Sequence, residues 1–98
     1  MQILGIETSC DETGVAIYDT KLGLIYNRTK SQNGHKKYGG VVPENAAENH
    51  AQNITSMVKQ ALQYTKPTSI NAVSYTAGPG LTGALLVGAT FSCAFARA

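Results

Sequence analysis

The sequence predicts an α/β fold in which a mixed β-sheet carries two helices, with the elements in the order β-β-β-α-β-α. Three observations support this fold class. Short runs rich in Ile, Val, Leu and Tyr lie between turn-forming residues near the amino terminus and predict strands. A central segment repeats apolar residues every three or four positions, as an amphipathic helix does. A glycine turn then joins a fourth strand to a largely apolar helix. Because the central helix connects the three-stranded meander to this fourth strand, the sheet is expected to be mixed.

The first three strands are predicted at residues 2–6, 13–19 and 23–29, where they form an antiparallel meander. The polar segment 7–12 lies between the first two strands and fits a hairpin tip that projects functional groups from a rigid base. Residues 19–21 form the turn before the third strand.

The second part of the chain predicts a loop, a helix, a strand and another helix. Residues 31–42 are rich in glycine and polar side chains, which predicts an irregular loop long enough to suggest a function. Pro43 precedes the helix predicted at 44–64, because a missing N–H is harmless at a helix start. A strand follows at 71–76, and a further helix begins at Leu81. The buried stripe of the first helix consists of Ala47, Ala51, Ile54, Val58, Ala61 and Leu62.

Length and composition predict one domain over residues 1–98, with no room for a second. The 8 Lys and Arg against 6 Asp and Glu give a net charge of +2, too weak for a nucleic-acid footprint on its own. The apolar run 81–96 is shorter than the roughly 20 residues that cross a bilayer, so no membrane span is expected. Without a signal-peptide pattern, we expect Cys10 and Cys93 to be reduced in the cytoplasm; a disulfide is the alternative.

Two loops follow the carboxyl ends of neighbouring strands, where open α/β sheets bind ligands. In the first loop the hydroxyls of Thr8 and Ser9 suit phosphate oxygens, and the carboxylates of Asp11 and Glu12 suit metal or proton handling, or orientation of a nucleophile. The alternative for the two acids is that they solvate a hairpin and cap its N–H groups.

The second loop contains Gly78, Pro79 and Gly80 and enters a helix whose first N–H groups suit an anion. It has neither the lysine of a P-loop nor the spacing of a dinucleotide fingerprint, so a tight strand-to-helix turn is an equal alternative. His35 and His50 lack a second ligand at metal-binding spacing, and His50 lies near the apolar stripe of the helix, which favours a partly buried structural histidine.

Four runs of residues together resemble the TsaD family, also called YgjD or Gcp. They are LGIETSCDET at 4–13, YGGVVPE at 38–44, YTAGPGL at 75–81 and GALLVGA at 83–89. The family comprises the tRNA N6-adenosine threonylcarbamoyltransferases, formerly named O-sialoglycoprotein endopeptidase. The resemblance implies an actin-like ATPase (ASKHA) fold of two related halves, of which this chain is expected to be the N-terminal half. The same element order occurs in the repeating half of actin, hexokinase and Hsp70.

The resemblance also implies a chemistry. The family is expected to transfer threonylcarbamoyl from threonylcarbamoyl-adenylate to the N6 of the adenosine beside the tRNA anticodon. Asp11 and Glu12 match acidic positions important to that site. The family binds a divalent metal, iron or zinc, and an adenine nucleotide, but the signature pair of histidines that holds the metal is expected beyond residue 98. We therefore expect this chain alone to bind no cofactor and to be inactive.

Partners follow from the same resemblance. Family members pair through helices with a shorter paralogue, TsaB, so residues 44–64 and 81–98 are predicted to include a pairing surface, with self-association as the substitute. Two other function classes stay open: a non-catalytic TsaB-like pairing module, and the metalloendopeptidase of the older family name. The peptidase is disfavoured because the chain offers neither a nucleophile–base set nor a metal triad.

Overall fold

The computed structural model describes residues 1–9, 11–31 and 43–97 and has the predicted order of strands and helices, with one short 3-10 helix added. The predicted loop at 31–42 lies almost wholly outside the described residues, as does Cys10. The elements are β1 (Gln2–Glu7), β2 (Glu12–Asp19), β3 (Gly23–Ser31), α2 (Pro43–Ala61), η1 (Pro67–Ser69), β4 (Ile70–Tyr75) and α3 (Thr82–Arg97).

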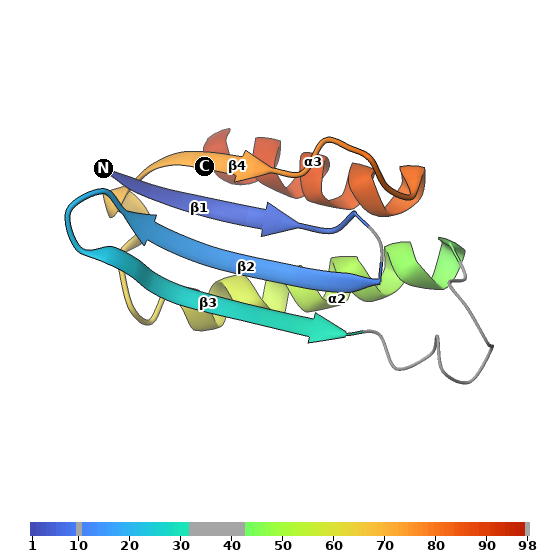
Figure 1. Ribbon diagram of the computed structural model, residues 1–98, viewed down its shortest axis with the longest axis horizontal. Helices are drawn as coiled ribbons and strands as arrows, with labels where there is room; N and C mark the ends of the chain where they lie inside the picture. The colour runs from blue at the N-terminus through green and yellow to red at the C-terminus, as the bar shows by residue number, and fades with distance from the viewer. Residues whose placement is uncertain (10, 32–42, 98) are drawn as a thin grey trace.

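The four strands form one mixed sheet in the order β3-β2-β1-β4 (Figure 1). β1 pairs antiparallel with β2, and β2 with β3, as a meander requires. β4 pairs parallel with β1, and the chain reaches it through α2, since a parallel neighbour needs a crossover. The sheet is therefore mixed, as the sequence predicts, and the carboxyl ends of β1 and β4 lie at the same end.

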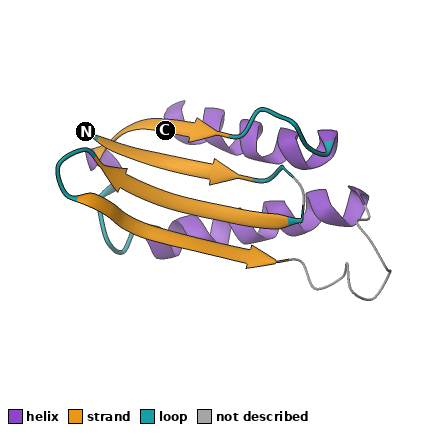
Figure 2. Ribbon diagram, in the orientation of Figure 1, coloured by secondary structure: helices purple, strands orange, loops and turns teal. Residues whose placement is uncertain are grey.

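The core lies between one face of this sheet and both helices, which run side by side (Figure 2). Alternation places Leu4 and Ile6 of β1 on that face, in register with Ile17 and Val15 of β2. All four side chains are buried, and residues of α2 and α3 pack against the same cluster. They are Ile54, Met57, Val58 and Ala61 of α2 and Val87, Phe91 and Phe95 of α3.

Helix α2 ends at Ala61, three residues before the predicted end. Beyond it, the backbone N–H of Gln63 bonds the Gln60 carbonyl and that of Tyr64 bonds the Ala61 carbonyl. Such bonds to the third preceding residue tighten the last turn into a 3-10 pattern. The Tyr64 ring then packs on Tyr26 of β3 at a centroid distance of 5.5 Å, which ties the segment after α2 to the sheet.

The β2–β3 turn depends on Asp19 and Gly23. The Asp19 carboxylate accepts hydrogen bonds from the backbone N–H groups of Lys21 at 2.7 Å and Leu22 at 3.1 Å, and these bonds lower the pKa of Asp19. Gly23 has φ +87°, a conformation that disfavours side chains. This turn lies at the opposite end of the sheet from the predicted site.

Neither described helix combines the length and the apolar character needed to span a membrane.

Candidate functional site

The two loops that the sequence predicts to be neighbours are in direct contact. Backbone hydrogen bonds run from the Thr76 N–H to the Ile6 carbonyl at 3.1 Å and from the Leu81 N–H to the Ser9 carbonyl at 2.7 Å. The parallel pairing of β1 and β4 produces this contact, because it brings the carboxyl ends of both strands together. Ser9 and the glycine loop, residues 78–80, thus form one continuous surface at this end of the sheet.

Gly80 is the point of closest approach between the loops. A Cβ atom at this position would lie 2.3 Å from the Ser9 carbonyl oxygen and 2.8 Å from the Ser9 Cβ, too close for any side chain. Gly78, two residues earlier, has no atom within 4 Å of an added Cβ. Gly78 therefore has room for a side chain, whereas the packing against Ser9 requires a glycine at position 80.

Thr8 joins β1 to helix α3. Its side chain is 1% exposed, and its hydroxyl donates to the Ala84 carbonyl at 2.7 Å and accepts from the Gly88 N–H at 3.2 Å. Gly88 allows this approach, because a Cβ there would lie 2.6 Å from the Thr8 Oγ1. The hydroxyl that the sequence assigns to the cleft is thus used inside the protein, where it positions the helix that follows the glycine loop.

Glu7 is the residue that sequence reasoning missed. Its carboxylate accepts hydrogen bonds from the backbone N–H and hydroxyl of Ser9 and, at 2.5 Å, from the hydroxyl of Thr76. Partial burial raises the pKa of Glu7, but the bonds from Ser9 and Thr76 outweigh burial, so that its pKa falls below the ordinary value. The hydroxyl residues Thr8 and Ser9, which directly follow Glu7, and Thr76 in the second family run were the available signal.

Asp11 and Glu12 lie where β2 begins, at the same end of the sheet as the two loops. Asp11 is half-buried, and Glu12, paired in register with Ser31 of β3, is exposed. Because Thr13 points to the helix face, alternation turns Glu12 to the opposite face. Their catalytic role stays a prediction.

His50 is fully buried, and its Nδ1 lies 2.6 Å from the Thr13 hydroxyl, which ties α2 to β2. This confirms the structural interpretation of His50, with deeper burial than predicted. His35 lies outside the described residues. Within the described ranges, no three His, Cys, Asp or Glu side chains are grouped so as to hold a metal, and Cys93 is an exposed free thiol. The described residues therefore do not by themselves fit the family's metal.

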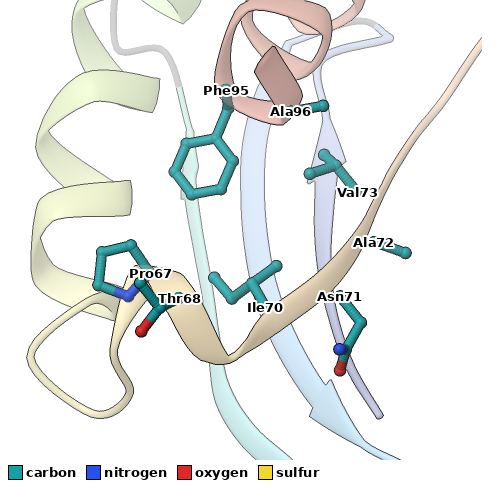
Figure 3. A pocket seen from close by; sticks show the side chains of 8 residues that line it. All are labelled: Pro67, Thr68, Ile70, Asn71, Ala72, Val73, Phe95 and Ala96. Carbon is teal, nitrogen blue, oxygen red and sulfur yellow. The ribbon is translucent and has the colours of Figure 1, made fainter. Parts of the chain in front are cut away.

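A cavity of about 340 Å³ lies at the other end of β4, against the last turn of α3 (Figure 3). Phe95, Ile70 and Val73 give it an apolar wall, and the described residues that line it carry no titratable side chain. The cavity lies beside the first residues of β4, so it is separate from the loops at the carboxyl end of that strand.

The two glycines of the second loop give a matched pair of substitutions. Gly80→Ala is expected to destabilise the fold by about 1–3 kcal/mol, because the added methyl group must displace the Ser9 backbone. Gly78→Ala, which adds the same methyl group in open space, is the control. Urea unfolding followed by circular dichroism measures both. Equal stability of the two variants would contradict the close approach.

Glu7 predicts a pH dependence. Because its folded-state pKa lies below the ordinary value of 4.5, the ionised carboxylate stabilises the fold fully above that pH and loses this effect as pH falls through the folded pKa. Glu7→Gln is therefore expected to be less stable than the wild type at neutral pH, with the difference shrinking in acid. Urea midpoints measured from neutral pH to about pH 3 test this. A difference that stays constant over that range would contradict it.

Sequence comparison places this chain among known proteins. A family model described as TsaD, tRNA N6-adenosine threonylcarbamoyltransferase, matches residues 23–98. A tRNA N6-adenosine threonylcarbamoyltransferase from Wigglesworthia glossinidia brevipalpis is 52% identical over 99 residues. That match covers 98% of this chain and 29% of the relative, so the chain spans less than a third of its length.

Two solved structures share the fold. YeaZ from Pseudomonas aeruginosa superposes with a TM-score of 0.74 at 16% identity, over 98% of this chain and 38% of that one. An uncharacterised protein with similarity to peptidase YeaZ from Pseudomonas aeruginosa gives a TM-score of 0.69 at 19% identity, with the same coverage. At such identities the likeness shows the fold alone. Given the match of the family model over most of its residues, the chain belongs to the TsaD family of tRNA N6-adenosine threonylcarbamoyltransferases.

Proposed function

We propose that this chain forms one wall of the cleft in which threonylcarbamoyl is transferred from threonylcarbamoyl-adenylate to the N6 of a tRNA adenosine beside the anticodon. The observation that carries the proposal is the contact between two family sequence runs, 4–13 and 75–81, through the 2.7 Å hydrogen bond from Leu81 to Ser9. Residues that are far apart in the chain and characteristic of the family thus meet at one sheet end. A tRNA substrate also agrees with a cytoplasmic location.

Each predicted residue has a distinct part in the proposal. Gly78, Pro79 and Gly80 form the part of the wall that faces the anionic part of the adenylate, because the N–H groups of the first turn of α3 follow directly. Ser9 supports this wall, since its N–H and hydroxyl bond the Glu7 carboxylate and its carbonyl accepts the Leu81 N–H. Thr8 belongs to the site indirectly, as the residue that fixes α3 against β1. This assignment replaces the predicted ligand contact, because the Thr8 hydroxyl already donates one hydrogen bond to α3 and accepts another from it.

Asp11 and Glu12 are proposed as the catalytic acids of this wall. Glu12 is the first residue of β2, pairs with Ser31 of β3 and is exposed to solvent, and Asp11 lies directly before the strand. A carboxylate in this position can accept a proton or orient an attacking amine. We derive no step through a metal, because the described residues do not assemble a site for one.

An adenine nucleotide fits this wall on one side only. Peptide N–H groups at the start of α3 suit a phosphate, and the open space beside Gly78 leaves room for the rest of the nucleotide. Tight binding needs converging groups that exclude water from both sides. Since the chain spans 29% of its relative, we propose that residues 1–98 alone are inactive and that the opposite wall comes from elsewhere in the complete enzyme.

Transplanting the chain into its relative tests the activity. Residues 1–98 replace the matching segment of the Wigglesworthia enzyme, and formation of threonylcarbamoyl-tRNA is measured with purified adenylate and tRNA. We expect activity from the hybrid, a loss of about 100-fold with Asp11→Asn or Glu12→Gln, and no product from residues 1–98 alone. Lys21→Gln, in the turn at the opposite end of the sheet, is the control. An active fragment, or full activity in both acid variants, would count against the proposal.

A pairing function is the second candidate, favoured by a groove of about 420 Å³ between the two helices. Its walls come from Ile54 and Thr55 of α2 and from Leu86, Val87 and Phe91 of α3. Leu86 is 59% exposed, so its apolar side chain at this groove is open to a partner. We propose that a helix of a structurally related paralogue, the TsaB-like partner, covers this groove, with a second copy of the chain as the substitute.

Leu86 allows a direct test of the pairing surface. The wild-type chain is expected to shift from monomer to dimer as concentration rises, and Leu86→Asp to remain monomeric because a charge is costly to bury in an apolar interface. Leu22→Asp places the same charge on a side chain that is 80% exposed in the β2–β3 turn. Size-exclusion chromatography with light scattering measures the mass. A strictly monomeric wild type, or dimers in both variants, would contradict the assignment.

A further inference from the structure

A small polar cavity of about 260 Å³ lies between the edge strand β3 and helix α2, away from the proposed cleft. β3 contributes the cationic side chains Arg28 and Lys30, and α2 contributes Asn53, Ser56 and Gln60. Arg28 and Lys30 also lie outside the runs that characterise the family. The cavity therefore lies apart from the residues that the proposed transferase function assigns to the cleft.

The pleat of β3 brings the two cations to one place. Tyr26, Arg28 and Lys30 alternate onto the same face of the strand, the face that α2 covers. Tyr26 is buried there, and its hydroxyl lies 3.4 Å from Gln60. In register with Arg28 and Lys30 are the buried Val15 and Thr13 of β2, which confirms the direction of the row.

Helix α2 offers hydrogen-bonding groups opposite these cations. Asn53, Ser56 and Gln60 follow one another at intervals of three and four residues, so they form one row along the helix. Met57 lies on the same side and gives the cavity an apolar wall. Two amides and a hydroxyl thus face a guanidinium and an ammonium group across a sheet edge that the helix covers only in part.

The charge of this cavity has one sign. None of the described residues that line it carries a carboxylate. Glu12, the acid nearest in the sheet register, alternates to the opposite face, because its neighbour Thr13 points towards α2. Arg28 and Lys30 are exposed, and a cavity with cations and neutral donors but no acid attracts an anion most strongly at low ionic strength.

The size and the donors identify the class of anion. The cavity of about 260 Å³ is small beside sites that enclose drug-sized ligands, which favours a small anion. The planar fork of Arg matches two oxygens of a phosphate, and Lys adds a compact charge with three donors. We infer that the cavity between β3 and α2 binds a phosphate group, either as free phosphate or as a phosphodiester of an RNA backbone.

Titration of the isotope-labelled chain with inorganic phosphate at low ionic strength, followed by NMR, tests the inference. Saturable shifts are expected for amides of β3 and α2 that line the cavity. The double variant Arg28→Gln, Lys30→Gln should bind phosphate about tenfold more weakly, because it loses two charge-assisted contacts. The control, Lys21→Gln with Lys66→Gln, removes the same charge at two exposed positions away from the cavity and should bind like the wild type.

Two further ligands distinguish the source of the phosphate. A short single-stranded RNA that binds with the same dependence on Arg28 and Lys30 supports a backbone phosphodiester, whereas binding of inorganic phosphate alone supports a free ion. Poly-glutamate supplies a carboxylate comparison. The inference is overturned if phosphate and RNA give only linear, non-saturating shifts, if the double variant binds as well as the control, or if poly-glutamate binds and phosphate does not.

Discussion

The carboxyl end of β1 holds the site together, because three consecutive residues there each bind a different later segment of the chain. Glu7 accepts a hydrogen bond from Thr76 at the end of β4, and the Thr8 hydroxyl binds two backbone groups of α3. The Ser9 carbonyl accepts the Leu81 N–H just before that helix. The Glu7 and Thr8 side chains make their bonds in different directions, and Ser9 makes its bond through the backbone carbonyl.

Small residues in the later segments permit these bonds. Gly80 meets the Ser9 backbone and Gly88 meets the Thr8 hydroxyl, and in both places an added Cβ would approach within 3.0 Å. Ala84, which is fully buried, lies one helical turn before Gly88 on the same side of α3. The glycines of the loop and helix are therefore needed for packing around β1, whatever ligand the wall faces.

The sheet then separates two surfaces with different chemistry. At the β4 side, the loops after β1 and β4 present backbone groups and the hydroxyl-rich run, with carboxylates at the nearby start of β2. At the β3 edge, Arg28 and Lys30 face polar groups of α2. Buried contacts between α2 and the meander, including the bond between His50 and Thr13, fix the distance between these surfaces. The net charge of +2 does not reveal that carboxylates lie on one of these surfaces and cations on the other.

The sequence by itself determined the order of the elements and their approximate bounds, because hydrophobic periodicity reports which side of a strand or helix is buried. It determined the family through the resemblance of four runs of residues. It also placed two loops at one end of the sheet. Only the tertiary structure decided which polar groups meet: Glu7 with Thr76, 69 positions apart, and Thr13 with His50, 37 apart. Thr8 shows the reason most clearly. A local pattern shows that a hydroxyl follows a strand, but its partner depends on how closely α3 packs, and that distance is set by residues 76 and 80 positions further along the chain.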